Sequence, residues 1–222
     1  MADEDPRTGA ARTHFDRWSR SYERDRSSRK LGEIQRRALA RLELGDDDIF
    51  LDVGCGTGAA VREAAGSVAR AVGLDLSPGM IAQARERAAG LANAEFVEGD
   101  AGAGLPFADG EFSAVLCTTA FHHFTSQREA IGEIARVLAP EGRVVIADGN
   151  PLHPGVFLLD RVLRVAQPSH VGLRSPRWLA RRLRRCGLRA VSIETIWRGA
   201  FALTSARKPA PRGIARLGRR RS

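Results

Sequence analysis

The chain has 222 residues, 43% of them hydrophobic, which suits one buried domain with appended elements and excludes two large domains. No run approaches the roughly 18 apolar residues that a membrane span needs, and the first residues are polar rather than an apolar secretory segment, so we expect a cytoplasmic protein. The net charge of +9 would suit a nucleic-acid-binding protein. However, nearly all of the 35 basic residues are arginines, a bias that is typical of proteins from GC-rich genomes. Nucleic acid is therefore the less favoured partner.

The chain divides into segments with different patterns. Residues 1–48 hold a helical pattern around Leu31–Leu44 and are expected to form an approach or lid segment before the main domain, residues 49–206. In that domain apolar β-type runs alternate with helical patterns, which is typical of a parallel sheet with crossover helices on both faces. The expected strands are Ile49–Val53, Val68–Leu74, Ala94–Val97, Phe112–Cys117, Arg143–Ala147, Leu188–Ile196 and Phe201–Ala206.

Three of the expected helices carry local start and stop signals. Ser77 can cap a helix whose first turn holds Pro78, and Gly90 can adopt the left-handed conformation that ends it. A helix after Ser175 has the same signals, with Pro176 in its first turn and Gly187 at its end. A third, over Ser126–Leu138, is expected to stop where a proline interrupts the helical hydrogen bonds.

Two segments fall outside this alternation. Residues 149–175 are interrupted by prolines and are expected to lie over the sheet edge, where they would shape an acceptor pocket. Residues 207–222 combine low hydrophobicity with clustered charge, so we expect a disordered tail whose deletion leaves the fold intact. Cys55, Cys117 and Cys186 lack the close spacing of a zinc or redox motif, so we expect free thiols and no metal.

A glycine-rich stretch, LDVGCGTG, follows the first expected strand. Its glycines, Gly54, Gly56 and Gly58, would let the backbone approach a ligand closely at the start of a helix. The dinucleotide-binding pattern can be forced onto this stretch, and its amides would then hold a pyrophosphate. Asp52 opposes that interpretation, because a carboxylate beside the loop favours a ligand with a positively charged amino group. An NAD-linked oxidoreductase is therefore the least favoured alternative.

Two more acids follow the next two expected strands. Asp75 stands about where a second-strand carboxylate binds ribose hydroxyls, and Asp100 can accept a hydrogen bond from an exocyclic adenine amine. Each aspartate alone could equally be a turn residue. Asp52, Asp75 and Asp100 stand at or just after the carboxyl ends of the first, second and third expected strands. In that order they match the ammonium, ribose and adenine groups of S-adenosylmethionine.

Four motifs carry a family resemblance: LDVGCGTG, VGLDLSPGMIAQAR, FVEGDAGAGLPFADGEFSAVLCTTAFHHF and EIARVLAPEGRVVIAD. They resemble the Rossmann-like S-adenosylmethionine-dependent methyltransferases, particularly the ubiquinone/menaquinone-biosynthesis and small-molecule branch. The resemblance implies S-adenosyl-L-methionine as cofactor and a doubly wound α/β sheet of seven strands, mostly parallel with an antiparallel last strand, with helices on both faces. The residues expected at the cofactor are Asp52, Gly54, Cys55, Gly56, Gly58, Asp75, Leu76, Met80, Asp100, Ala101, Thr118 and, near its methionine end, Tyr22.

The sulfonium methyl is already activated, so its in-line displacement mainly requires a well-positioned nucleophile. His122 and His123 follow the fourth strand and are the candidates for a general base, with a structural role as the favoured alternative. On an extended chain neighbouring side chains diverge, so we expect His122 to face the acceptor and His123 to support the fold between the buried rings of Phe121 and Phe124. In the strand before them, Phe112, Ala114 and Leu116 are expected to share one face.

The leading hypothesis is a methyltransferase that acts on an oxygen, nitrogen or carbon nucleophile of a small-molecule metabolite, such as a quinone precursor. One alternative is an RNA or protein methyltransferase, for which the arginines of Arg177–Arg185 would form a binding surface. Base-methylating enzymes of this fold often carry an Asn-Pro-Pro-aromatic motif after the fourth strand, where this chain reads CTTAFHH. The other alternative is a non-catalytic module that only binds S-adenosylmethionine.

Overall fold

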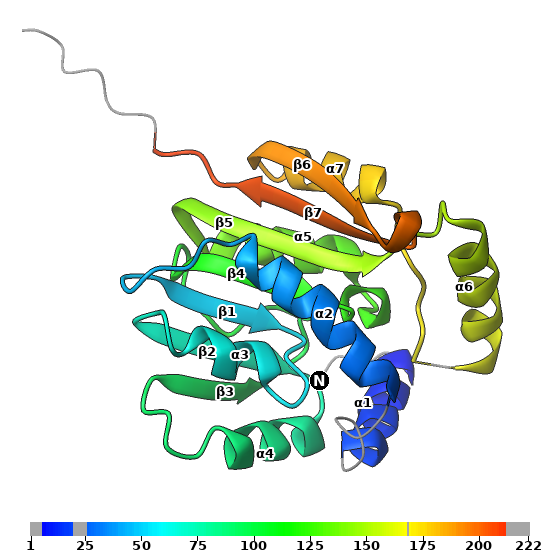
Figure 1. The fold of residues 1–222 in the computed structure, drawn as a ribbon, viewed down its shortest axis with the longest axis horizontal. Helices are drawn as coiled ribbons and strands as arrows, with labels where there is room; N and C mark the ends of the chain where they lie inside the picture. The colour runs from blue at the N-terminus through cyan, green and yellow to red at the C-terminus, as the bar shows by residue number, and fades with distance from the viewer. Residues whose placement is uncertain (1–5, 20–25, 168, 212–222) are drawn as a thin grey trace, which may run out of the picture.

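The computed structural model describes residues 6–19, 26–167 and 169–211, which fold around one seven-stranded sheet (Figure 1). The strand order is β3-β2-β1-β4-β5-β7-β6. Strands β1 to β5 pair in parallel, and β7 lies antiparallel between β5 and β6. The predicted sheet with an antiparallel last strand is thereby confirmed. The strands are β1 Ile49–Val53, β2 Arg70–Asp75, β3 Ala94–Glu98, β4 Phe112–Thr118, β5 Leu138–Gly149, β6 Arg189–Ile196 and β7 Phe201–Arg207.

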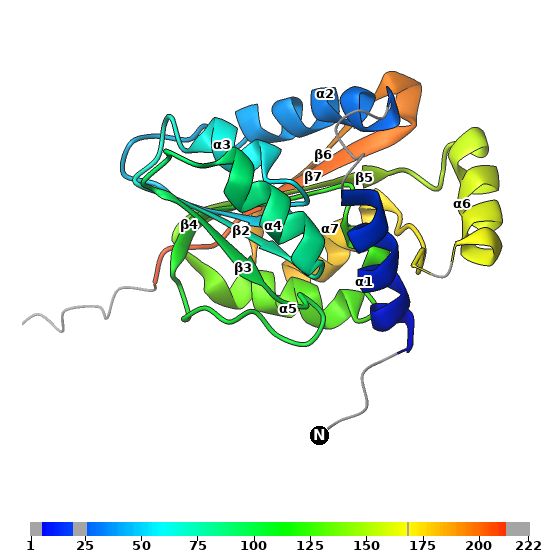
Figure 2. The same cartoon turned by 90° about the horizontal axis from the view of Figure 1, so that it is seen from below.

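Helices cover both faces of the sheet (Figure 2). Helices α2, α3 and α4 pack on one face, and α5 and α7 pack on the other. Successive strand residues point to opposite faces, so Phe50 joins the core beneath the first group and Leu51 the core beneath the second. Helices α1 and α6 lie beyond the carboxyl ends of the parallel strands (Figure 1). The α-helices are α1 Pro6–Ser19, α2 Arg26–Ala40, α3 Ala59–Ala64, α4 Pro78–Arg87, α5 Gln127–Val137, α6 Pro154–Ala166 and α7 Pro176–Arg185.

The predicted helix signals are confirmed at atomic detail. The Ser77 hydroxyl accepts a hydrogen bond from the backbone amide of Met80 at 3.0 Å, which satisfies one of the free amides at the start of α4. Ser175 caps α7 in the same way, through the amide of Trp178. After α4 the chain turns at Gly90 with a φ of +99°, a conformation that favours glycine.

Strand β4 departs from the predicted alternation at its start. A register shift against β5 separates Phe112 from Ala114, and beyond it the pairing continues without interruption. Phe112 therefore packs in the core beneath α5 and α7, whereas Ala114 and Leu116 belong to the core on the other face. The expectation that Phe112 shares a face with these two residues is wrong. Phe112 stands before the register shift, at which β5 advances from Leu138 to Arg143 while β4 advances by two residues, so the regular pairing that holds Ala114 and Leu116 does not extend to it.

Two helices lie in segments where no helix was predicted. Helix α6 occupies part of the proline-interrupted segment 149–175, and its Pro154 stands in the first helical turn, where the missing amide costs nothing. Helix α1 precedes the predicted amino-terminal helix. None of the helices in the described part of the chain is long and apolar enough to cross a membrane.

The predicted start of the carboxyl-terminal tail at residue 207 is wrong, since Arg207 is the last residue of β7 and Lys208 packs against the end of α5. The ammonium of Lys208 donates a hydrogen bond to the carbonyl of Ala135 at 2.8 Å and to that of Arg136 at 3.3 Å. Its backbone amide also donates to the carbonyl of Gly142 at 2.9 Å. The two bonds of the ammonium satisfy carbonyls that the last turn of α5 leaves free. Residues 212–222 lie outside the described residues.

Two truncations test this boundary. Deletion of 212–222 should leave the melting temperature within about 1 °C of the full chain, because this stretch has too few apolar residues to repay the entropy of ordering it. Deletion of 208–222 should lower it by several degrees, because the five hydrogen bonds of Lys208, at roughly 1 kcal/mol each, are lost. Circular dichroism melts of the three proteins make the comparison. Equal melting temperatures would show that Lys208 has no structural role.

Candidate active site

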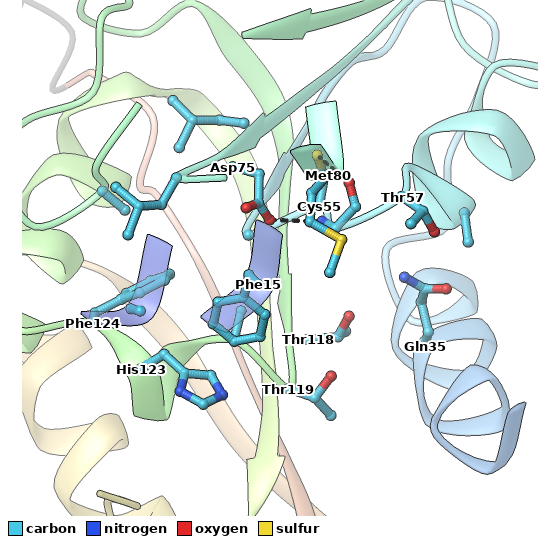
Figure 3. A pocket seen from close by; sticks show the side chains of 18 of the residues that line it. Phe15, Gln35, Cys55, Thr57, Asp75, Met80, Thr118, Thr119, His123 and Phe124 are labelled. Atoms are coloured by element: carbon cyan, nitrogen blue, oxygen red, sulfur yellow. Dashed lines mark hydrogen bonds between the residues drawn. The ribbon is translucent and has the colours of Figure 1, made fainter. Parts of the chain in front are cut away.

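A cavity of about 360 Å³ opens at the carboxyl ends of β1, β2 and β4 (Figure 3). We call it the first cavity. Nine of the twelve residues predicted at the cofactor line it, although they come from five separate places along the chain. They are Gly54, Cys55, Gly56, Asp75, Leu76, Met80, Asp100, Ala101 and Thr118.

The other three residues predicted at the cofactor are not among those that line the first cavity. Tyr22 lies outside the described residues. Gly58 has a φ of +77°, and a Cβ there would lie 2.6 Å from the ring of Phe96, so this glycine serves the packing of α3 against the sheet. Asp52 lies beneath the loop rather than in the cavity wall.

Asp52 is a buried carboxylate without a hydrogen-bond partner among the described residues. Only 1% of the residue is exposed, and neither carboxylate oxygen has a partner. Burial, with repulsion from Asp75 as a smaller cause, raises the pKa of Asp52 to about 8. An unpaired buried carboxylate is costly, so this position fits a ligand that brings a positive charge close to it.

Asp75 organises the loop as well as lining the first cavity. One of its carboxylate oxygens accepts a hydrogen bond from the amide of Gly56 at 2.8 Å, and the other accepts from the amide of Ser77 at 2.9 Å. Burial raises the pKa of Asp75, while these two amide bonds act in the opposite direction. The carboxylate thus ties the glycine loop to the start of α4.

The glycines of the loop have different physical roles. A Cβ on Gly56, whose φ is +53°, would meet no atom within 4 Å, so this residue presents bare backbone to the first cavity. A Cβ on Gly54 would lie 2.4 Å from the Cβ of Ala120, so the loop and the turn after β4 can approach only because residue 54 is glycine. An open backbone cradle beside acids at the strand ends fits S-adenosylmethionine.

Residues of the amino-terminal helices complete the first cavity and were not predicted. Phe15 of α1 lies over it, and Gln35 of α2 points toward the glycine loop (Figure 3). Asp16 accepts a hydrogen bond from the amide of Gly79 at 3.0 Å and another from the hydroxyl of Ser77, which anchors α1 on α4. No local pattern in the sequence reveals this wall, because it depends on how α1 docks.

A second cavity, of about 970 Å³, adjoins the first between α1, α6 and the ends of β5 and β7. Four residues line both cavities, namely Phe15, Leu31, Thr119 and His123. Most of the other lining residues are apolar, and the polar ones include histidines next to His123, where the two cavities meet. The apolar residues include Trp18, Val156, Leu159, Leu163, Leu173 and Phe201, and the polar ones include His122, Asp148, Asp160, Gln167 and His170.

The two histidines after β4 do not divide between pocket and core. Both line the second cavity, and His123 also lines the first, where its ring meets that of Phe15 edge-on at 4.8 Å between centroids. The prediction assumed an extended chain, but residues Phe121–His123 form a turn of 3-10 helix, in which neighbouring side chains share a side more easily. Phe121 is buried as expected, whereas Phe124 lines the first cavity.

Both histidines are held at their Nδ1 atoms. His122 Nδ1 lies 2.8 Å from a carboxylate oxygen of Asp148, and His123 Nδ1 lies 2.7 Å from the carbonyl oxygen of Ser169. Burial, followed by repulsion from His122, lowers the pKa of His123 well below its usual value. The imidazole of His123 is therefore neutral at neutral pH.

Comparison with known proteins agrees with this site. Residues 51–146 match the family described as "Methyltransferase domain". A demethylmenaquinone methyltransferase of Clavibacter sepedonicus is 31% identical over 96% of this chain and 96% of its own length, and one of Mycobacterium marinum is 31% identical over 94% and 97%. The solved structure of a putative methyltransferase in complex with the Haloferax volcanii Trm112 methyltransferase activator has the same fold, with a TM-score of 0.78 at 22% identity over 88% of this chain and 97% of that one.

The family follows from these likenesses together with the fold. The relatives align over almost the whole chain, and the sheet order and the acids at the strand ends are those expected from the sequence motifs. The chain belongs to the Rossmann-like S-adenosylmethionine-dependent methyltransferases, and it is an enzyme that moves a methyl group from S-adenosylmethionine to a small-molecule acceptor.

Proposed function

We propose that the first cavity holds S-adenosylmethionine and that the second holds a lipophilic acceptor with a hydroxylated ring. The observation that carries this proposal is the junction of the two cavities at Phe15, Thr119 and His123. S-adenosylmethionine supplies an activated methyl group, and its displacement requires the acceptor to stand close and in line. Two adjoining cavities with shared walls meet that requirement.

The residues of the first cavity divide the work of holding S-adenosylmethionine. Asp75 would accept hydrogen bonds from the ribose, Asp100 would bind the adenine amine, and Asp52 would favour the amino group through the glycine loop. Gly56 leaves room for the methionine part. Phe15 of α1 lies over the cavity and would keep water from the reacting atoms (Figure 3).

The relatives are named for a demethylmenaquinone, and the second cavity fits an acceptor of that kind. We infer its reduced form, because a ring with hydroxyl groups is the more nucleophilic one. The apolar wall of the second cavity suits a fused ring, and the histidines at the shared end could hydrogen-bond the ring hydroxyls. Helix α6 beside it exposes a row of apolar side chains that an apolar tail on the acceptor would cover. They are Phe157, Leu158, Leu159, Val162 and Val165.

A methyl-transfer assay with reduced naphthoquinones tests the proposal. With S-adenosylmethionine, the chain should methylate a demethylmenaquinol with an isoprenoid tail at lower KM than a tailless naphthohydroquinone. Leu163→Gln, in the wall of the second cavity, should raise the KM of the acceptor about tenfold or more, because it places a polar group against an apolar ligand, and should leave the KM of S-adenosylmethionine unchanged.

Ile193→Gln provides the matched control, because Ile193 is an exposed apolar residue on β6 that lines neither cavity. Its KM values should equal those of the unmodified chain. If S-adenosylhomocysteine binds but no reduced quinone is methylated, the acceptor class is wrong. An equal effect of the two substitutions would remove the second cavity from the acceptor site.

A further inference from the structure

Three histidines converge at the end of the second cavity nearest the first. One ring nitrogen from each of His122, His123 and His170 lies within 4.8 Å of the others. The ring centroid of His122 lies 4.0 Å from that of His123 and 5.0 Å from that of His170. We call these residues the three-histidine cluster. Three imidazoles whose nitrogens lie this close together suit one shared ligand that accepts nitrogen donors.

The backbone holds the two contributing segments together. The carbonyl of His122 accepts hydrogen bonds from the amides of Val171 at 3.1 Å and Gly172 at 3.0 Å. The turn after β4 and the segment after α6 are thereby fixed to each other on either side of the cluster. A geometry supported by main-chain bonds varies less than one made by side chains on separate loops.

Each histidine of the cluster has one ring nitrogen engaged by a neighbouring oxygen. His122 Nδ1 lies 2.8 Å from Asp148, His123 Nδ1 lies 2.7 Å from the carbonyl of Ser169, and His170 Nε2 lies 2.8 Å from Asp160. The remaining nitrogens are Nε2 of His122, Nε2 of His123 and Nδ1 of His170. Histidines that bind metals almost always donate their second N–H to a carboxylate or carbonyl in this manner, which orients the ring.

The oxygen partners are themselves anchored. Asp160 accepts hydrogen bonds from Arg164 at 2.9 Å and from the amide of Leu173 at 2.8 Å. Asp148 accepts from the amides of His122 at 3.0 Å and Gly149 at 2.8 Å. Asp148 and Asp160 both lie beside the cluster, and Arg164 pairs with Asp160. Two carboxylates beside one such guanidinium favour an added positive charge at the cluster.

We propose that the three-histidine cluster binds a divalent transition-metal cation of the Zn²⁺ type, with one coordination position open toward the second cavity. Imidazole nitrogens suit zinc, cobalt, nickel and copper, whereas magnesium and calcium prefer oxygen ligands. Two nitrogens that each lie about 2.1 Å from one metal are at most about 4.2 Å apart, so the rings move slightly inward when the cation binds. Three protein ligands leave the fourth position to water or to a substrate atom.

The open position gives the cation a role in the acceptor site, and this role rests on the proposed function. A hydroxyl oxygen of the ring acceptor in the second cavity would coordinate the cation, release its proton to solvent and remain bound as an oxyanion. The bound oxyanion would have a fixed orientation beside His123, at the junction of the two cavities. The cluster would thus select acceptors that carry a ring hydroxyl.

Metal binding is measured on the full chain without an affinity tag, stripped with a chelator, and in the absence of S-adenosylmethionine and acceptor. Titration with Co²⁺ should produce the visible absorption of a four-coordinate cobalt site and reach one cation per chain, and Zn²⁺ should displace it. His123→Gln should weaken Co²⁺ binding at least tenfold, because glutamine keeps a polar side chain of similar length and removes a nitrogen ligand. Asp148→Asn should weaken it about 10-fold to 100-fold by loosening His122.

His153→Gln is the matched control, because His153 precedes α6 and lies outside the cluster. Its cobalt spectrum and affinity should equal those of the unmodified chain. Absence of a stoichiometric cobalt signal, or equal binding by the His123 and His153 variants, would overturn the proposal. Should His123→Gln fail to fold by circular dichroism, Asp148→Asn decides the outcome. Because no S-adenosylmethionine or acceptor is present, failure here leaves the proposed methyl transfer untouched.

Discussion

Asp75→Ala should weaken S-adenosylhomocysteine binding at least a hundredfold. The carboxylate of Asp75 lines the first cavity and also holds the amides of Gly56 and Ser77 at 2.8 Å and 2.9 Å. Its removal costs the hydrogen bonds proposed to the ribose, at about 1.5–3 kcal/mol each for a charged acceptor, and frees the loop beneath the ligand. Isothermal titration calorimetry measures the dissociation constant, and the shift in melting temperature on adding ligand provides a second readout.

Glu98→Ala is the control for this experiment. Glu98 ends the neighbouring strand, where it pairs with Asp75 in register, but it does not line the first cavity. Its substitution should leave the dissociation constant unchanged. An unchanged dissociation constant in Asp75→Ala would contradict the cofactor site itself, because no other carboxylate among the lining residues stands at the end of β2.

Asp52→Asn should stabilise the ligand-free protein in alkaline solution. The native pKa of Asp52, about 8, is higher than the value near 3.9 expected in the unfolded chain. Folding therefore favours the protonated form, and its stabilising effect is complete below about pH 4 and is lost as the pH rises to about 8. Between pH 5 and pH 8 the loss is on the order of 4 kcal/mol. Asparagine does not titrate, so the difference in unfolding free energy between the two proteins should grow over that range.

Urea unfolding of both proteins at pH 5, 6.5 and 8 measures this difference. Taking the difference between the two proteins removes the contribution of groups that titrate in both. A difference that does not change with pH would show that Asp52 is already ionised in the ligand-free fold.

The same carboxylate should report on the bound ligand. If the amino group of S-adenosylhomocysteine favours the ionised form of Asp52, binding at pH 7 releases a proton. Calorimetry in two buffers with different ionisation enthalpies counts that proton. Asp52→Asn should bind without releasing it.

Local sequence determined the strands, the helix caps and the acids at the strand ends. The Ser77 cap, the exit at Gly90 and the alternation of strands and helices each depend on residues within a few positions of one another. The family motifs depend in the same way on short stretches of chain. This explains why nine of the predicted cofactor residues come together in one cavity.

Contacts between distant segments determined the rest. The face on which Phe112 packs depends on the register shift between β4 and β5, and the bonds of Lys208 depend on its meeting the end of α5. Neither has a local signal, since each is made only when the sheet is complete.

The acceptor side belongs to this second class. Phe15 reaches the junction of the cavities because Asp16 anchors α1 on α4, and His170 joins the two histidines after β4 because main-chain bonds tie its segment to theirs. The sequence by itself determined the part of the first cavity that the strand ends and the glycine turn form, because these are local features. Only the tertiary structure decided the second cavity, because its walls come from segments that meet only through the packing of the whole domain.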